Sequence, residues 1–144
     1  MAEFEGIDHV DCRVRSLPAV EPFYDALMPE LGLPEKRYSH VDERGDWHAV
    51  SAERPHNATE YYESRRSDRA PWFVGFIERR DHAANLTRIA FRVSPARLLE
   101  LEGRLAAMGA RAVERSEKMD EYPAIFFEDP AGTKLELVAR LPAP

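Results

Sequence analysis

The sequence has one cysteine, Cys12, among its 144 residues. A single cysteine forms no disulfide within the chain, and it excludes a zinc site built from a cluster of cysteines. No apolar run approaches the roughly 18 residues that a membrane-spanning helix needs. The acidic start, MAEFEGIDHV, lacks the basic residues and apolar run of a secretory signal. We therefore expect a cytoplasmic protein that has no membrane partner.

An excess of positive charge is also lacking. Lysine and arginine number 20 against 26 aspartates and glutamates, so the formal net charge is −6. This balance argues against nucleic acid and against an anionic membrane surface as the main partner. Hydrophobic residues make up 44% of the chain, which is enough for the core of one ordinary domain. The composition therefore predicts a single folded domain over residues 1–144.

The two halves of the chain carry the same order of patterns. The segments IDHVDCRV (7–14) and LTRIAFRV (86–93) both alternate and both end in Arg-Val. Each is followed by a serine and a proline, which are typical of a helix start, and each predicted helix ends at a glycine. Such a repeat indicates two similar modules, which we place at residues 5–80 and 84–140.

Short strands are predicted after each helix, at 36–41, 46–52 and 72–78 in the first half and at 111–115, 124–128 and 134–139 in the second. Each half therefore reads βαβββ, and the fold class is α+β. Pro22 and Pro29 predict that the first helix is short or kinked. The polar segment 53–71 has no counterpart in the second half, and we interpret it as a long loop.

Alternation along the strands separates a polar face from an apolar face. In the first strand His9, Asp11 and Arg13 share the polar face. In the last strand Glu136 lies between two leucines, so it points away from the core. Two interpretations of these polar faces stay open. The charges are either simply solvated, as on half-exposed antiparallel sheets, or they line a cleft in which a histidine and a glutamate suit a divalent metal.

Three stretches of the chain resemble one family. They are GIDHVDCRV followed by PFYDALMPELGL, then RIAFRVSPARLLELEGRLAAMGA, and AIFFEDPAGTKLELV. Together they are similar to the vicinal oxygen chelate superfamily, the group of glyoxalase I, bleomycin and fosfomycin resistance proteins and extradiol dioxygenases. The resemblance implies two βαβββ modules that form a cupped mixed β-sheet with helices on its outer face, and a homodimer. In metal-binding members a divalent ion sits in the cup and substrate oxygens chelate it.

Carried over residue by residue, the resemblance assigns catalysis and metal binding to His9 and Glu136, with Zn, Fe, Mn or Ni as the metal. The family's other two ligand positions fall on Arg88 and near Gly75. An arginine has no acceptor atom and a glycine has no side chain, so neither coordinates a metal through a side chain. We therefore expect Arg88 to form an ion pair with Glu136 in place of the metal.

Two functions follow from the resemblance, and the sequence leaves both open. The first is a glyoxalase-like or dioxygenase-like enzyme, a metal-dependent lyase, isomerase or dioxygenase that acts on a small oxygen-rich substrate. The second is a metal-free binding or sequestration protein of the bleomycin-resistance type for a small polar or anionic ligand. In either case the expected substrate-binding residues are Arg88, Arg92, Arg13, Asp11, Tyr122 and His48. We expect Phe73, Phe126 and Phe127 to pack in the core.

Overall fold

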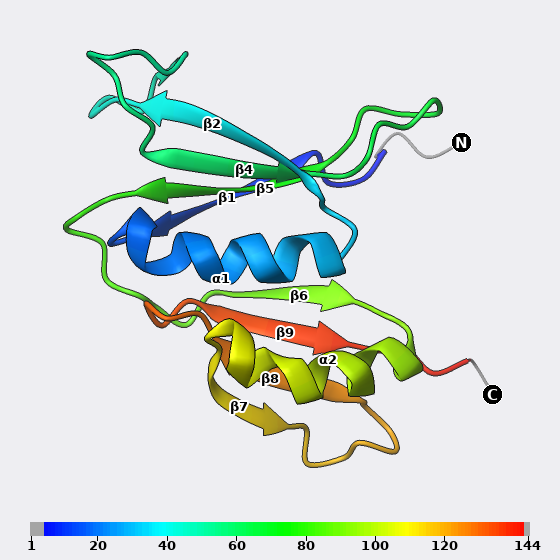
Figure 1. Ribbon diagram of the computed structural model, residues 1–144. Coiled ribbons are helices and arrows are strands. Elements are labelled where there is room, and N and C mark those ends of the chain that lie inside the picture. Colours follow the sequence, from blue (N-terminus) through cyan, green and yellow to red (C-terminus); the bar gives the residue numbers. More distant parts are fainter. Residues whose placement is uncertain (1–4, 143–144) are drawn as a thin grey trace. The chain divides into compact units, whose positions relative to one another are not determined.

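A computed structural model describes residues 5–142 of the chain. Its elements follow in the order β1 (His9–Val14), α1 (Leu17–Glu30), β2 (Glu35–Val41), β3 (Trp47–His48), β4 (Ala58–Tyr62), β5 (Phe73–Glu78), β6 (Arg88–Arg92), α2 (Pro95–Met108), β7 (Arg111–Arg115), β8 (Ala124–Glu128) and β9 (Lys134–Val138) (Figure 1). None of the helices in these residues is long and apolar enough to cross a membrane.

The described chain divides into two compact units. One unit takes in the chain up to Leu17 and then Met28–His82, and the other takes in Pro18–Leu27 and the chain from Ala83 onward. The middle of α1 therefore belongs to the core of the second unit. There the ring of Phe23 meets that of Phe127 edge-on, with centroids 6.5 Å apart.

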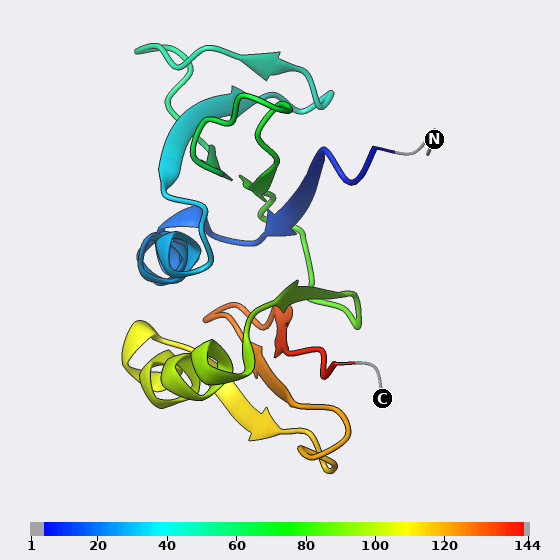
Figure 2. The ribbon, with the colours of Figure 1, turned by 90° about the vertical axis from the view of Figure 1, so that its right-hand side faces the viewer.

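The first unit contains a five-stranded sheet in the order β1-β5-β4-β2-β3. Strand β1 runs parallel to β5, and the other neighbours are antiparallel. The sheet curls along its length, which is plainest where β2 bends (Figure 2). The strand pairing aligns His9 on β1 with Phe73 on β5 and then with Tyr62 on β4. It aligns Asp11 in the same way with Gly75 and then with Glu60.

The second unit contains a four-stranded sheet in the order β6-β9-β8-β7, with β6 parallel to β9. Helix α2 lies on one face of it and buries Leu98, Leu101 and Leu105. The side chain of Ser94 accepts the Arg97 N–H at the start of α2. The repeated strand–helix–strand order and the mixed sheets confirm the predicted α+β fold class.

The segment 53–71 is not the long loop that we expected. Its residues Ala58–Tyr62 form β4, which pairs with both β2 and β5. Thr59 and Tyr61 of this strand are almost completely buried. Threonine and tyrosine favour strands, but the charged residues on both sides of ATEYY hide the pattern. The predicted strand at 46–52 is correspondingly reduced to the two residues of β3.

Helix α1 has 14 residues, as many as α2, so the two prolines do not shorten it. Its first backbone N–H, that of Leu17, donates to Oε2 of Glu78 at 2.9 Å. Glu78 therefore faces the start of the helix. Gly75, by contrast, pairs with Asp11 on one side and with Glu60 on the other. A carboxylate satisfies one free N–H at the helix start and also complements the helix dipole.

We expect Glu78→Ala to lower the free energy of unfolding by about 1 kcal/mol, because the variant removes this capping acceptor. Urea denaturation followed by circular dichroism measures the change. Glu43→Ala is the matched control, because Glu43 is exposed and its substitution should change the stability by less than about 0.5 kcal/mol. Equal stability of the two variants would contradict the capping role.

Candidate functional site

In the first unit, His9 lies between two carboxylates. Its Nδ1 is 2.7 Å from Oδ2 of Asp8, and its Nε2 is 3.5 Å from Oδ2 of Asp11. The hydrogen bond to Asp8, with the added charge of Asp11, raises the pKa of His9 above its ordinary value. Both carboxylates thus favour the imidazolium, which donates protons and does not ligate a metal.

A column of stacked planar groups holds the His9 ring. The ring lies parallel to that of Phe73, with centroids 4.6 Å apart and planes inclined by 4°. Phe73 stacks in turn on Tyr62 at 4.4 Å, and the Arg37 guanidinium lies 4.2 Å from the centre of the Tyr62 ring. Phe73 is therefore only half-buried on the polar face, and its expected place in the core is wrong.

The carboxylate of Asp11 occupies the space that Gly75 leaves. A Cβ at position 75 would lie 2.6 Å from Oδ1 of Asp11. That oxygen is buried and has no hydrogen-bond partner in the described structure. On the other side of Gly75, the nearly buried Glu60 accepts hydrogen bonds from the hydroxyls of Ser39 at 2.6 Å and Tyr62 at 2.7 Å. Burial and this bond to Glu60 raise the pKa of Tyr62 to about 12.

In the second unit, Glu136 is the buried acid of the polar face, with 6% of its surface exposed. Its Oε1 accepts a hydrogen bond from the Tyr122 hydroxyl at 2.7 Å. This bond raises the pKa of Tyr122, so the phenol keeps its proton at neutral pH. Strand register places Ala90 and Phe126 beside Glu136.

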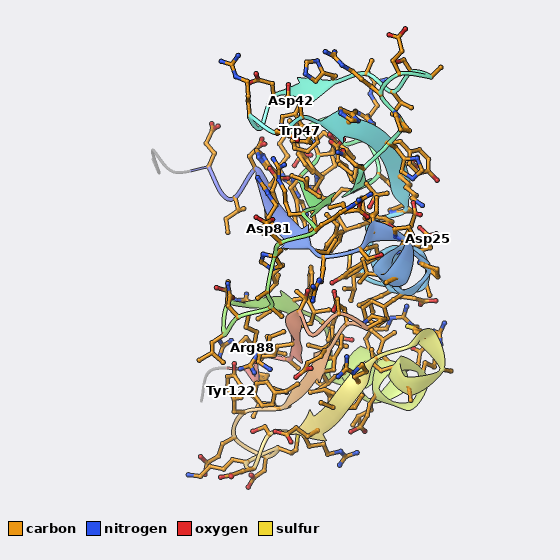
Figure 3. The ribbon with its side chains drawn as sticks, turned by 90° about the vertical axis from the view of Figure 1, so that its left-hand side faces the viewer. Asp25, Asp42, Trp47, Asp81, Arg88 and Tyr122 are labelled. Carbon is orange, nitrogen blue, oxygen red and sulfur yellow. The ribbon has the colours of Figure 1, made fainter. Side chains whose placement is uncertain are left out.

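The expected ion pair between Arg88 and Glu136 is wrong: the two side chains form no ion pair in the described residues, and the register puts Lys134 beside Arg88. The Arg88 guanidinium lies 4.8 Å from the centre of the Phe126 ring instead, and it is close enough to Tyr122 to act on that residue's pKa. Arg88 and Tyr122 both lie on the side of the sheet away from α2 (Figure 3). Phe126 is accordingly half-buried under Arg88, whereas Phe127 is in the core as expected.

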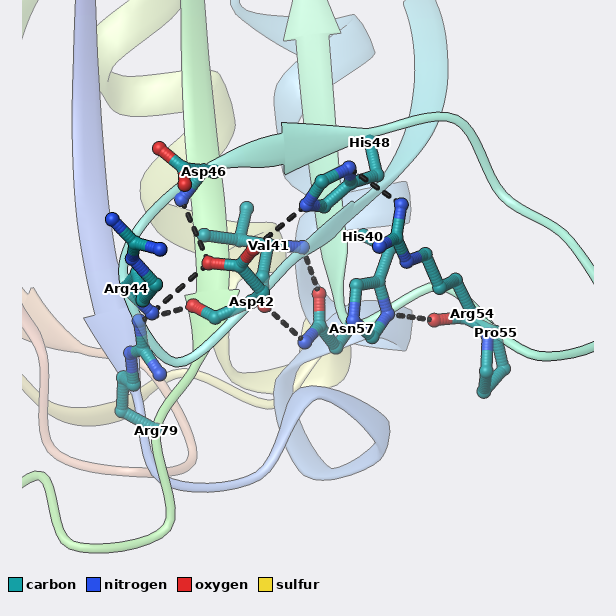
Figure 4. A network of polar contacts seen from close by, with 10 residues as sticks. All are labelled: His40, Val41, Asp42, Arg44, Asp46, His48, Arg54, Pro55, Asn57 and Arg79. Atoms are coloured by element: carbon teal, nitrogen blue, oxygen red, sulfur yellow. Dashed lines mark hydrogen bonds and ion pairs between the residues drawn. The ribbon is translucent and has the colours of Figure 1, made fainter.

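His48 lies apart from the other predicted site residues of the first unit. Its strand, β3, is at the opposite end of the strand order from β1. Its Nε2 lies 2.7 Å from Oδ2 of Asp42, and its Nδ1 lies 2.7 Å from Nη1 of Arg54 (Figure 4). An arginine only donates, so Nδ1 of His48 is the acceptor in the contact with Arg54. The bond from His48 lowers the pKa of Asp42 to about 2.

The remaining predicted residues lie near strand ends. Arg13 shares the polar face of β1 with His9 and Asp11. Arg92 is the last residue of β6 and is exposed beside Val138. The structure thus groups His9, Asp11 and Arg13 in the first unit, and it groups Arg88, Tyr122 and Glu136 in the second.

A pocket of roughly 180 Å³ opens in the second unit, and its lining residues are Arg88, Ala112, Glu114, Phe126, Phe127, Glu128 and Lys134. Glu114 and Ala112 are not among the site residues that the sequence predicts. Alternation alone does not identify them, because the register of β7 against β8 shifts between Arg111 and Glu114.

The residues of each unit taken alone do not fit a divalent metal. No group of three or more histidine, cysteine, aspartate or glutamate side chains that could hold a metal ion occurs in residues 5–142. Of the four ligand positions that the resemblance implies, His9 lies in the first unit and Glu136 in the second. The other two are Arg88, which stacks on Phe126, and Gly75, whose side-chain space Asp11 fills.

No protein-family model matches the sequence, and no curated protein matches it. Solved structures do match. A glyoxalase/bleomycin resistance protein from Albidiferax ferrireducens T118 is 19% identical, with a TM-score of 0.61 over 94% of this chain and 98% of that one. The fosfomycin resistance protein FosX from Listeria monocytogenes is 17% identical, with a TM-score of 0.60 over 96% of this chain and 95% of that one.

A FosX variant from Listeria monocytogenes, complexed with Mn(II) and 1S,2S-dihydroxypropylphosphonic acid, also matches. It is 19% identical, with a TM-score of 0.58 over 95% of this chain and 93% of that one. These structures match nearly the whole chain with TM-scores of 0.58 to 0.61, which show a shared fold. The chain therefore has the vicinal oxygen chelate fold of the glyoxalase/bleomycin resistance proteins and FosX, as its sequence predicts.

Proposed function

We propose that the chain binds a small molecule with an anionic group on the polar face of the second sheet, and that Arg88 contacts this anion. The observation that carries the proposal is the position of the Arg88 guanidinium. It is exposed at the pocket, lies over Phe126 and forms no ion pair with any residue in 5–142. A planar guanidinium binds carboxylates and phosphonates through paired hydrogen bonds.

The neighbours of Arg88 suit a ligand that also carries a hydroxyl or carbonyl group. Phe126 supports the guanidinium plane and offers an apolar wall. Glu136 uses Oε1 for the Tyr122 bond, and its Oε2 has no hydrogen-bond partner in the described part of the chain. That oxygen is an acceptor for a ligand hydroxyl and a base for its proton. All of these contacts come from protein side chains, so they require no metal.

A metal-dependent enzyme of the glyoxalase or dioxygenase type is the second candidate. Two observations favour it. Asp8 binds Nδ1 of His9, as carboxylates do behind metal-bound histidines. A protein of the same fold was also solved with Mn(II). A bound metal would act as a Lewis acid on substrate oxygens. His9 would first have to lose the proton that Asp8 and Asp11 favour.

The proposal is tested by isothermal titration with methylphosphonate, phosphonoacetate and lactate in the presence of EDTA. We expect binding without metal and at least a tenfold loss of affinity in Arg88→Met, which keeps the bulk of the side chain but removes its charge. Arg65→Met is the control, because Arg65 is an exposed arginine of the first unit.

The opposite outcome supports the second candidate. If the anions bind only after Mn(II), Zn(II), Fe(II) or Ni(II) is added, and both His9→Ala and Glu136→Ala abolish that binding, the metal-free proposal is wrong. Metal content by plasma mass spectrometry on protein without a polyhistidine tag gives an independent measure. Light scattering on the same samples tests the homodimer that we also propose.

A further inference from the structure

We propose that the ligand of this pocket is a zwitterion of amino-acid size, and that Glu114 on β7 binds its cationic amino group. This inference rests on the proposed function, in which Arg88 binds the anionic group of the same molecule. It adds a second charged contact on the opposite edge strand of the sheet.

The strand register points Glu114 into the pocket. Glu114 is the partner of Phe126, whose ring lies beneath Arg88. The next residue, Arg115, forms a bidentate ion pair with Glu102 of α2, with both N–O distances 2.6 Å. Successive strand residues point to opposite faces, so Glu114 lies on the face away from α2. It forms no ion pair with any residue that the structure describes.

An irregularity in β7 shapes this wall of the pocket. The pairing of β7 with β8 shifts register between Arg111 and Glu114. Within the shift, Ala112 has φ of 51°, a left-handed conformation that costs a residue with a Cβ roughly 1 kcal/mol. Such bulges change the direction of side chains and are common beside functional sites. Here the bulge places Ala112 and Glu114 together in the lining of the pocket.

The other charges of the pocket compensate each other. Lys134 on β9 donates to Glu128 on β8 at 2.8 Å. The two charged groups left in the lining are therefore Arg88 on β6 and Glu114 on β7, and the four charges sum to zero. A simple anion is attracted by Arg88 but repelled by Glu114. A molecule with both charges gains from both residues, so charge complementarity favours a zwitterion over a matched anion or cation.

The size of the pocket restricts the ligand further. Roughly 180 Å³ is below the range of about 300–1,000 Å³ typical of sites for drug-sized molecules. The half-buried ring of Phe126 forms an apolar surface between the two charged edges. A single amino acid or a molecule of that class has the required size, the two charges and an apolar part.

The inference is tested with matched probe sets in which only the charged groups differ. One set is phenylalanine, 3-phenylpropionate and 2-phenylethylamine, and another is alanine, propionate and ethylamine. Each probe is titrated to millimolar concentration into ¹⁵N-labelled protein, and the amide signals of residues 112–114 and 126 are followed. In at least one set we expect the amino acid to bind at least tenfold more tightly than both its matched acid and its matched amine.

Glu114→Gln should lower the affinity for the amino acid to that of the matched acid, without weakening the binding of the acid itself. Glu117→Gln is the control, because Glu117 is an exposed glutamate after the same strand. If acids bind as tightly as amino acids in an Arg88-dependent manner, the zwitterion inference is wrong and the proposed function stands. If neither acids nor amino acids shift these signals, both are wrong.

Discussion

Asp129→Ala is expected to lower the free energy of unfolding by about 3–4 kcal/mol. Asp129 follows β8 and is completely buried. Its Oδ1 accepts the backbone N–H groups of Ala131 and Thr133 at 2.8 and 2.9 Å, and its Oδ2 accepts the Tyr24 hydroxyl at 2.7 Å. Alanine removes both acceptor oxygens and with them all three hydrogen bonds. The buried Tyr24 hydroxyl and the two part-buried N–H groups then lose their partner, and a buried donor without a partner costs roughly 1–3 kcal/mol.

Graded variants separate this role from simple loss of volume. Asp129→Asn keeps an acceptor oxygen for the two backbone groups and should cost about half as much. Tyr24→Phe removes one of the three bonds and should cost about 1 kcal/mol. Urea denaturation followed by circular dichroism ranks the series. Asp120→Ala, at an exposed site in the same unit, is the control. If Asp129→Ala is no less stable than this control, the buried carboxylate does not stabilise the turn.

The residues Asp-Pro-Ala-Gly indicate a turn, but they do not indicate that the aspartate is buried. Proline and glycine mark a turn through their own backbone preferences, which are local. The partner of Asp129 lies 105 residues away in the chain, on α1. No pattern within the stretch FFEDPAGTKLELV indicates that contact.

The same distinction explains the error at β4. The segment Ala58–Tyr62 pairs on both sides, so its burial depends on strands distant in sequence. The charged residues on both sides of it are typical of a loop, and the alternation within ATEYY is too short to predict a strand against them. The repeated βαβββ order was predictable, by contrast, because each helix carries its own start and stop signals.

For the site, alternation correctly placed His9, Asp11 and Arg13 on one face of their strand. The alternation did not predict which residue forms a hydrogen bond with Glu136. The partner depends on register, which puts Ala90 rather than Arg88 beside Glu136 and leaves the Tyr122 hydroxyl as its donor. A shift of two residues in strand pairing would have brought the arginine to the acid.

Gly75→Ala is expected to lower the free energy of unfolding by about 1–3 kcal/mol, the usual cost of an added methyl group in a filled space. The new Cβ would lie 2.6 Å from Oδ1 of Asp11, so the carboxylate must move. Across the strand Glu60, nearly buried and already bonded to Ser39 and Tyr62, is a second negative charge. Moving the Asp11 carboxylate toward Glu60 is therefore unfavourable, because the two acids would repel each other.

A double-mutant cycle isolates the cause. In the Asp11→Ala background Gly75→Ala should cost less than about 0.5 kcal/mol, so the two changes are strongly non-additive. Gly103→Ala is the matched control, because nothing lies within 4 Å of a Cβ at that helical position. It should raise the stability by about 0.5–1 kcal/mol through helix propensity. Additive costs at positions 11 and 75 would show that the glycine does not make room for the carboxylate.

The contact between Asp11 and Gly75 also affects the pKa of His9, which a stability measurement does not report. Asp11 helps to raise the pKa of His9, although the hydrogen bond to Asp8 is the larger cause. Displacing the Asp11 carboxylate in Gly75→Ala should therefore lower the pKa of His9, as followed by NMR titration of its ring protons. Asp11→Ala should lower it in the same direction, and adding Gly75→Ala to that variant should change it no further. A pKa of His9 that is unchanged in Gly75→Ala would mean that Asp11 keeps its position and that the strand backbone moves instead.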